Sequence, residues 1–182
     1  MLPSGEELKL KNRIQKIGFG GGCHWCTEAV FQSLIGIQKV EQGFILSEEE
    51  YNTFSEAVIV HFNPEEISLR NLIEIHLYTH KSTSEHSMRS KYRSAIYSFD
   101  EIQQMNSEAI LEELQMEFEK TIITKVLPFK HFKESDQMFQ NYYYKNPEKP
   151  FCETHINPKL SLLMTQFKRS VNIEKLNSKE LI

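Results

Sequence analysis

The chain has 182 residues, of which 40% are hydrophobic and 25% are charged, and its formal net charge is −4. These values are ordinary for one globular domain. The net negative charge gives no indication of the basic surface that binds nucleic acid. No apolar run approaches the roughly 18 residues of a membrane span, and the N-terminus lacks the basic and apolar regions of a secretory signal. We therefore expect a cytoplasmic protein with neither a nucleic-acid nor a membrane partner.

The hydrophobic pattern predicts alternating strands and helices through the first two thirds of the chain. The segment 56–62 is apolar on both faces, which indicates a central strand. Asp100 with Gln103 forms a capping-box signature that opens a helix. In chain order the expected elements are strand 12–19, helix 23–34, strand 37–44, strand 56–62, helix 68–79, strand 93–99, helix 100–119 and strand 121–126. This order predicts an α+β fold, a two-layer sandwich with a ferredoxin-like βαββαβ core and a C-terminal extension.

The extension is expected to contain a short helix over 135–144, a turn-rich stretch and a last helix after Pro158. The polar segment 81–91 reads as a long loop, and loops of that length in compact domains are often functional. We expect a single domain over 1–182 with its core at about 12–160. Residues 1–11 and 168–182 are expected to be loosely ordered because they are polar.

The most informative stretch is Gly-Gly-Gly-Cys-His-Trp-Cys-Thr-Glu at residues 20–28. It lies between an expected strand and an expected helix, so Cys23 falls at or near a helix N-terminus. Unpaired N–H groups and the helix dipole favour a thiolate there, and the thiolate is the reactive form of cysteine. Trp25 and His24 can supply an aromatic wall for a small apolar group.

Three other interpretations remain open at this point. The cysteines can be inert core residues. Cys23 and Cys26 can form the redox pair of a thiol–disulfide oxidoreductase. The pairs Cys23/Cys26 and Cys152/His155 also have zinc-ligand spacing, which would indicate a non-catalytic zinc-binding module.

Residues 21–28 resemble the Gly-Cys-Phe-Trp-Cys-x-Glu signature of peptide methionine sulfoxide reductase A. The likeness continues at Glu-Ala-Val 56–58, at Tyr-Arg-Ser-Ala-Ile-Tyr 92–97, at Gln-Asn-Tyr-Tyr 140–143 and at Asn-Pro 146–147. These blocks occur in the order of the family and cover roughly residues 14 to 160. One block alone would be a weak signal, whereas the ordered set is specific.

The resemblance implies reduction of methionine S-sulfoxide, free or in proteins, without a metal or cofactor. Cys23 matches the nucleophile, which attacks the sulfoxide sulfur and becomes a sulfenic acid. Trp25 matches the aromatic residue that packs on the substrate methyl group. Glu56 matches the acid that protonates the sulfoxide oxygen, and Tyr92 matches the tyrosine that donates a hydrogen bond to that oxygen.

The resemblance also implies a way to recycle the enzyme. Cys152 resembles the resolving cysteine, which would form a disulfide that thioredoxin reduces. Cys26 is the competing resolver, although closing a bond within one helical turn requires that turn to distort. A relative that binds oxidised methionine without turnover is a further alternative.

The sequence departs from the family at the rim of the expected site. His24 stands in place of phenylalanine and brings a group that can titrate near neutral pH. Tyr51 is a tentative match for the second tyrosine of the family. Ser87 and Arg89 stand where the family has aspartate and glycine, so a polar contact to the substrate, tentatively assigned to Ser87, is missing or remade.

Overall fold

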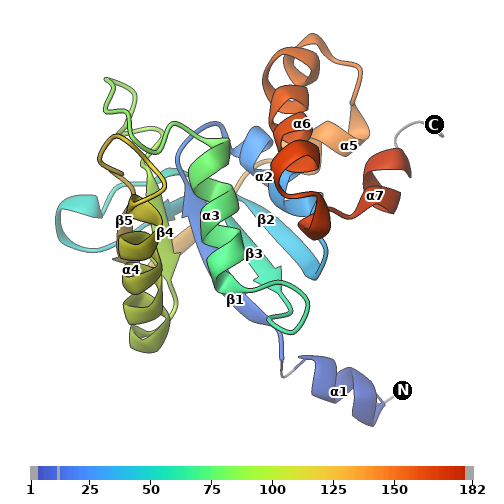
Figure 1. Ribbon diagram of the computed structural model, residues 1–182, viewed down its shortest axis with the longest axis horizontal. Helices are drawn as coiled ribbons and strands as arrows, with labels where there is room; N and C mark the ends of the chain where they lie inside the picture. The colour runs from blue at the N-terminus through green and yellow to red at the C-terminus, as the bar shows by residue number, and fades with distance from the viewer. Residues whose placement is uncertain (1–3, 12, 179–182) are drawn as a thin grey trace.

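A computed structural model describes residues 4–11 and 13–178 of the chain (Figure 1). Its helices are α1 (Gly5–Lys11), α2 (His24–Gln32), α3 (Leu69–Thr79), α4 (Glu101–Gln115), α5 (Tyr142–Lys145), α6 (Asn157–Gln166) and α7 (Ile173–Asn177). Its strands are β1 (Gln15–Gly20), β2 (Ile37–Leu46), β3 (Ser55–Phe62), β4 (Ala95–Ser98), β5 (Lys125–Pro128) and β6 (His131–Glu134). Short 3₁₀ turns occupy Glu49–Tyr51, Gln137–Phe139 and Lys168–Ser170, and a π-helical turn occupies Cys152–Ile156.

The six strands form one sheet in the order β5-β4-β1-β3-β2-β6. Only the β4–β5 pair is parallel among the strand pairs of the described residues. The succession β1-α2-β2-β3-α3-β4, with β4-β1-β3-β2 in the sheet, is the predicted ferredoxin-like core. The predicted α+β class is therefore confirmed.

The two faces of the sheet bury different sets of side chains. Along β3, Val58, Val60 and Phe62 belong to the large core beneath the helices. Ala57 and Ile59 belong to a smaller cluster on the opposite face. This alternation confirms the prediction of a central strand that is buried on both sides.

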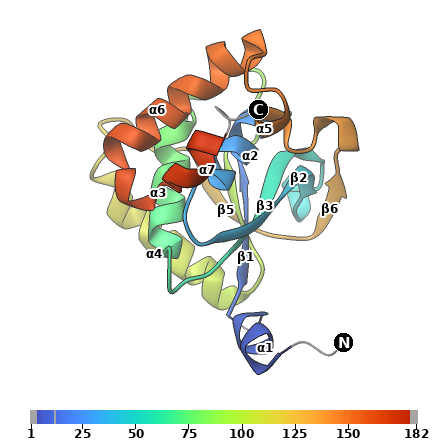
Figure 2. The same ribbon diagram turned by 90° about the vertical axis from the view of Figure 1, so that its right-hand side faces the viewer.

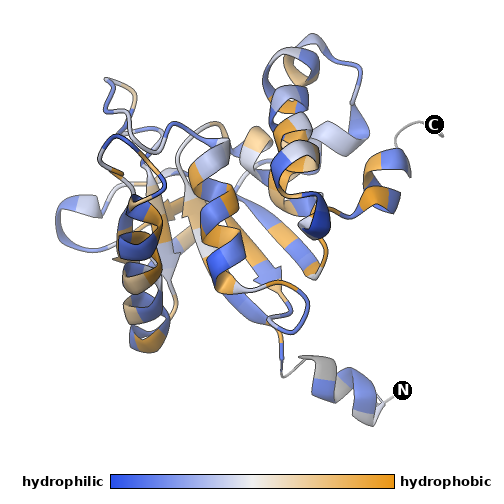
Figure 3. Ribbon diagram, in the orientation of Figure 1, coloured by the Kyte–Doolittle hydropathy of each residue, from blue (hydrophilic) through white to orange (hydrophobic). Residues whose placement is uncertain are grey.

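The helices gather on the face of the large core. Buried residues of α2, α3, α4 and α6 all belong to that cluster, and Figure 2 shows these helices together on one side of the sheet. Hydrophobic and hydrophilic residues alternate along α3 in Figure 3, as expected of a helix with one buried face. The Ser68 hydroxyl caps this helix by accepting from the Asn71 N–H at 3.1 Å.

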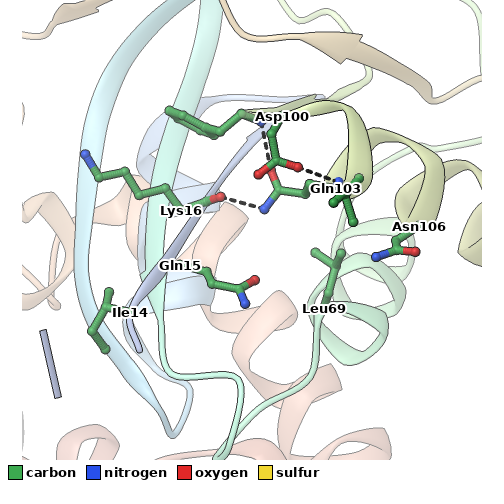
Figure 4. A pocket seen from close by; sticks show the side chains of 9 residues that line it. Ile14, Gln15, Lys16, Leu69, Asp100, Gln103 and Asn106 are labelled. Atoms are coloured by element: carbon green, nitrogen blue, oxygen red, sulfur yellow. Dashed lines mark hydrogen bonds between the residues drawn. The ribbon is translucent and has the colours of Figure 1, made fainter. Parts of the chain in front are cut away.

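The capping box predicted at α4 is partly present. The Asp100 carboxylate accepts from the Gln103 N–H at 2.7 Å, as the signature requires (Figure 4). The Gln103 side chain reaches one residue further back, where its Oε1 accepts from the Phe99 N–H at 2.8 Å. Its amide group donates to the Lys16 carbonyl at 2.8 Å. The cap therefore also joins α4 to β1.

Several predicted boundaries were wrong. The expected helix 135–144 is broken because Asn141 adopts a left-handed conformation with φ 54°. Pro128 is the last residue of β5 rather than a breaker beyond an earlier strand, which an edge strand tolerates. Pro158 lies in the first turn of α6 instead of before it, where its missing N–H costs nothing. The strand β6 was not predicted.

A buried polar network holds the C-terminal extension against the core. The Gln42 amide group donates to the Glu28 carboxylate at 3.0 Å and to the Phe139 carbonyl at 2.8 Å. The same Glu28 oxygen accepts from the Tyr142 N–H at 3.2 Å. The Ser135 hydroxyl donates to Gln42 Oε1 at 2.7 Å. Glu28 is 1% exposed, and burial raises the pKa of its carboxyl group.

The expectation of one domain with loosely ordered ends stays a prediction. Near those ends the described residues form α1 and α7. Residues 1–3 and 179–182 lie outside the described residues. No helix in the described part of the chain combines the length and the apolar character needed to span a bilayer.

Candidate active site

Cys23 is the N-cap residue of α2, directly after the glycine turn that follows β1. Its carbonyl accepts from the N–H groups of Cys26 at 3.1 Å and Thr27 at 3.2 Å, which starts the helix. A Cβ on Gly21 would lie 2.4 Å from the His80 ring, and a Cβ on Gly20 would lie 2.9 Å from the Arg93 carbonyl. Two of the three glycines therefore allow the turn to lie against neighbouring segments, and these contacts fix where Cys23 is presented.

The two cysteines of the first helical turn have opposite electrostatics. A hydrogen bond from the Cys26 thiol lowers the pKa of Cys23, and backbone N–H groups of the turn add to this effect. Burial and the charge of Glu56 oppose it. The same hydrogen bond, together with burial, raises the pKa of Cys26. The pair therefore consists of a thiolate-forming Cys23 and a Cys26 that remains a proton donor.

Cys23 opens into a pocket of about 420 Å³. Its lining residues are Gly21, Gly22, Cys23, Cys26, His80, Lys81, His86, Met88, Tyr92, Phe151, His155 and Lys159. Met88 and Phe151 provide apolar surface on the walls, and Tyr92 brings a phenol group into the same space. A polarised thiol beside apolar walls and a hydroxyl donor suits a substrate with an apolar sulfur group and a polar oxygen.

Glu56 lies at the start of β3, is 8% exposed and is not among the residues that line this pocket. Its Oε2 accepts from the His24 N–H at 3.0 Å. Its Oε1 lies 3.7 Å from the Lys91 Nζ, and Lys91 also lies over the Tyr92 ring. The carboxyl group predicted as the proton donor is thus attached to the same helix start as Cys23 and linked through Lys91 to Tyr92.

The His24 side chain does not line the pocket of Cys23. Its Nδ1 lies 2.7 Å from the Gly43 carbonyl, and its ring meets Phe44 edge-on at 5.1 Å. Burial lowers the pKa of His24, although the nearby Glu56 opposes the shift. Burial against the sheet therefore favours the neutral imidazole, and the expectation that this residue can titrate near neutral pH stays a prediction.

Trp25 belongs to an aromatic cluster built by the C-terminal extension. Its ring stacks on Tyr142 at 4.2 Å and on Phe139 at 5.3 Å, and it meets Phe151 edge-on at 5.2 Å. Its indole Nε1 is buried without a hydrogen-bond partner among the described residues. Phe151 also lines the pocket of Cys23, so the predicted aromatic wall lies next to that pocket and is shared with the extension.

The structure does not bring Tyr51 to Cys23. Tyr51 lines a separate hollow of about 280 Å³, where the cationic groups of Arg93 and Lys125 lie over its ring. Ser87 is exposed on the loop before Tyr92 and is not among the residues that line the pocket. The positions of Tyr51 and Ser87 therefore do not support the substrate contacts tentatively assigned to them.

Arg89 stands before Tyr92 at a position where the family has glycine, and its side chain makes polar contacts there. Its guanidinium group donates to the carbonyls of Gly21, Lys81, Ser84 and Tyr92 at distances between 2.5 and 3.0 Å. One side chain therefore ties the glycine turn to both ends of the 81–92 loop. These bonds are to the protein itself, so the prediction that a polar contact to the substrate is missing or remade here stays a prediction.

Cys152 lies in the π-helical turn and is 0% exposed. Its thiol donates to the Asn146 carbonyl at 3.3 Å. Its charge acts on Cys26, and the Cys26 thiol lies 4.0 Å from the His155 carbonyl of the same turn. The fold thus brings the third cysteine near the first two from about 130 residues away in the sequence.

Sequence reasoning missed two residues of the site. His80 stacks on His76 at 4.1 Å and packs against the glycine turn. Its position after an amphipathic helix and before a long polar loop was the available signal. Lys159 reaches the pocket from α6, and its sequence neighbourhood gives no such signal. In the described part of the chain, no three His, Cys, Asp or Glu side chains are grouped as metal ligands.

Another hollow, of about 530 Å³, lies at the opposite end of β1 between that strand and the start of α4 (Figure 4). Gln15, Lys16 and Asp100 are among its lining residues. It contains no thiol, and its polar groups serve the cap of α4. The pocket at Cys23 is therefore the stronger candidate for chemistry.

Known proteins resemble this chain in sequence and in fold. A family model described as peptide methionine sulfoxide reductase matches residues 15–171. A peptide methionine sulfoxide reductase MsrA of Deinococcus radiodurans is 36% identical, over 80% of this chain and 78% of its own. Mxr1 from Saccharomyces cerevisiae in its reduced form has a TM-score of 0.69 at 25% identity, covering 79% of this chain and 92% of that chain. The crystal structure of Mxr1 in complex with Trx2 has a similar fold, with a TM-score of 0.54 at 22% identity over 72% of this chain and 86% of that chain.

The family match spans the glycine turn, the loop that ends at Tyr92 and the π-helical turn with Cys152. This extent, together with a relative more than one-third identical over most of both chains, shows that the chain belongs to the peptide methionine sulfoxide reductase family.

Proposed function

We propose that this protein reduces methionine S-sulfoxide, free or in oxidised proteins, to methionine. One observation carries the proposal: the Cys23 thiol, its pKa lowered at a helix start, opens into a pocket shared with Tyr92, and the Glu56 carboxylate accepts a hydrogen bond from the same helix start. The family membership supports the same reaction. The thiol–disulfide oxidoreductase and zinc-module alternatives explain neither the buried acid at this helix start nor the extent of the family match.

In the proposed reaction the Cys23 thiolate attacks the sulfoxide sulfur. Glu56 and Tyr92 hydrogen-bond to the sulfoxide oxygen and supply the proton it needs as its bond to that sulfur breaks. The protonated oxygen leaves as water, which leaves Cys23 bonded to the substrate sulfur as a sulfonium. A water molecule then attacks the Cys23 sulfur and breaks this S–S bond, so the substrate sulfur takes the electron pair and departs as a thioether, while Cys23 is left oxidised as a sulfenic acid. Trp25, through its cluster with Phe151, is proposed to bound the space for the methyl group.

The proposed recycling step uses Cys152. Its thiol attacks the sulfenic acid on Cys23, releasing water and forming a disulfide that thioredoxin reduces. Closeness of the π-helical turn to α2 supports this role, and the crystallised complex of Mxr1 with Trx2 supports the reductant. A cytoplasmic location is part of this proposal, because thioredoxin recycling belongs to a reducing compartment.

A dithiothreitol-driven assay on the two separated sulfoxide epimers tests the reaction. We expect turnover of the S epimer only and its loss in Cys23→Ser, because serine cannot supply the thiolate. Full activity in that variant would contradict the assignment of the nucleophile.

Thioredoxin-driven cycling tests the resolving residue. Cys152→Ser should release one methionine per protein and then stop, while Cys26→Ser should continue to cycle. The reverse pattern would exchange the roles of Cys26 and Cys152. Cys26→Ser keeps a hydroxyl donor beside Cys23, so it is the matched control for the first turn of α2.

A further inference from the structure

The pocket at Cys23 has a basic wall that the proposed reaction does not use. Lys81 contributes from the start of the 81–92 loop, and Lys159 contributes from α6. Three histidines also line the pocket: His80, His86 and His155. None of the lining residues is acidic, although the whole chain carries a net charge of −4. The basic wall is therefore a local feature rather than a reflection of composition.

Within the described residues, neither Lys81 nor Lys159 has a carboxylate within 4.0 Å. Lys91 differs from them, because its Nζ lies 3.7 Å from Glu56. The Lys159 ammonium group donates to the Thr79 carbonyl at the end of α3, which orients the group without supplying a negative charge. Glu85, the acidic residue within the 81–92 loop, exerts its charge on Arg89.

The two lysines act on each other and on the thiols. Burial lowers the pKa of Lys159, and the charge of Lys81 lowers it further by a smaller amount. The thiols of Cys26 and Cys23 favour the charged form. Two cations on one wall, one of them partly desolvated, create a positive potential that focuses inside a cleft. An anionic group placed along this wall would relieve their repulsion.

We propose that this pocket selects methionine sulfoxides that carry a carboxylate close to the sulfoxide, and that Lys81 and Lys159 bind this carboxylate. The inference rests on the proposed function and adds the substrate class. The carboxylate has two sources, the α-carboxylate of the free amino acid and an Asp or Glu side chain beside the oxidised methionine in a protein. Both present the same oxygen acceptors to an ammonium group.

Two matched substrate pairs separate the sources. The first pair is free methionine S-sulfoxide and its α-amide, and the second is a peptide with Glu on both sides of methionine S-sulfoxide and the same peptide with Gln. For each pair, kcat/KM is measured with dithiothreitol at low and at high salt. We expect the charged member to be favoured about tenfold or more in at least one pair, with a smaller ratio at high salt because screening weakens exposed charges.

Variants connect the preference to the lysines. The ratio of kcat/KM within a pair should fall toward one in Lys81→Gln and further in Lys81→Gln/Lys159→Gln, whereas Lys81→Arg should keep it. The ratio does not depend on how much protein is active, and Lys81 is exposed, so its replacement leaves the core intact. Lys16→Gln is the control, because Lys16 lines the distant hollow at the other end of β1 (Figure 4).

The outcomes separate this inference from the function on which it rests. Equal kcat/KM within both pairs, or a preference that survives loss of both lysines, would overturn the selection while leaving the reductase activity in place. No turnover of any S-sulfoxide, charged or neutral, would overturn the proposed function and this inference with it.

Discussion

At the scale of single residues, Arg89 shows how this chain compensates for an unusual loop. Glycine at this position would leave the loop free of side-chain contacts, whereas the guanidinium group here satisfies backbone carbonyls of four residues. The planar fork of arginine suits such an arrangement, and the compact ammonium group of lysine does not. Arg89 therefore determines where Tyr92 and the glycine turn lie relative to each other.

We expect Arg89→Ala to lower kcat/KM for the S-sulfoxide by about 10- to 100-fold, because a small misplacement of catalytic groups is costly. Arg89→Lys should recover little of this loss, since the fork rather than the charge makes the contacts. Steady-state kinetics with dithiothreitol measure the effect. Arg70→Ala is the matched control, because Arg70 pairs with Glu74 on the exposed face of α3. Full rescue by lysine would show that charge alone is needed.

At the scale of elements, the end of α3 carries two neutral histidines beneath the site. The His76 Nε2 donates to the Gly20 carbonyl at 2.8 Å. The His80 Nδ1 donates to the His76 carbonyl, so its Nε2 accepts from the Ser94 hydroxyl at 2.7 Å. Burial lowers the pKa of His80 to about 3 and that of His76 well below its usual 6.5. This end of the helix therefore supports the glycine turn with uncharged rings.

These depressed pKa values predict a loss of stability in mild acid. The unfolded chain binds a proton at each histidine below about pH 6.5, and the folded chain does so only near the lower pKa. Stability is thus complete above pH 6.5 and falls as pH drops from there toward the folded pKa. For His80, whose folded pKa is about 3, the loss at pH 5 is about 2 kcal/mol. Urea unfolding at pH 7.5 and pH 5 should show this loss, and His80→Asn should reduce it by about that amount.

His131→Asn, at an exposed position, is the control for losing any one histidine. An unchanged pH dependence in His80→Asn would mean that His80 is protonated equally easily in the folded and unfolded chain.

At the scale of the whole molecule, the C-terminal extension is attached through the buried Glu28–Gln42 network. Glu28→Ala should leave the Gln42 amide and the Tyr142 N–H without their acceptor, at a cost of about 1–3 kcal/mol for each buried group. Hydrogen exchange should therefore be about tenfold faster or more in residues 135–142 than in the wild type. Glu28→Gln keeps an acceptor oxygen and should remain close to the wild type. Equal protection in both variants would show that packing alone attaches the extension.

The parts of this molecule that the sequence predicted are those specified by neighbouring residues. The turn before Cys23, the cap at Asp100 and the doubly buried β3 strand each depend on local chemistry, and each is present. The prediction failed where distant segments decide the outcome. Asn141 breaks a helix where its neighbours Phe139 and Tyr142 bond to the Glu28–Gln42 network.

The candidate site likewise contains residues that the sequence predicted and residues whose placement depends on distant segments. Its family signature identified Cys23, Glu56 and Tyr92, which the fold brings to one end of β1 and β3. The placement of His24 and Tyr51 depends on which side of the sheet their segments cover, and no local pattern encodes that. Lys159 joins the pocket only because α6 packs against α2 and α3.

The burial of Cys152 affects how long the oxidised form of Cys23 lasts. The buried Cys152 thiol donates to the Asn146 carbonyl, so in the proposed cycle it must leave this contact before it attacks the sulfenic acid, and the cycle joins a chemical step in the pocket to a local rearrangement of the π-helical turn. Between the two events the oxidised Cys23 persists. A second oxidant molecule arriving in that interval would carry it to a sulfinic acid, which thioredoxin does not reverse. The packing of one turn thus sets how long the protein is vulnerable to the stress that it repairs.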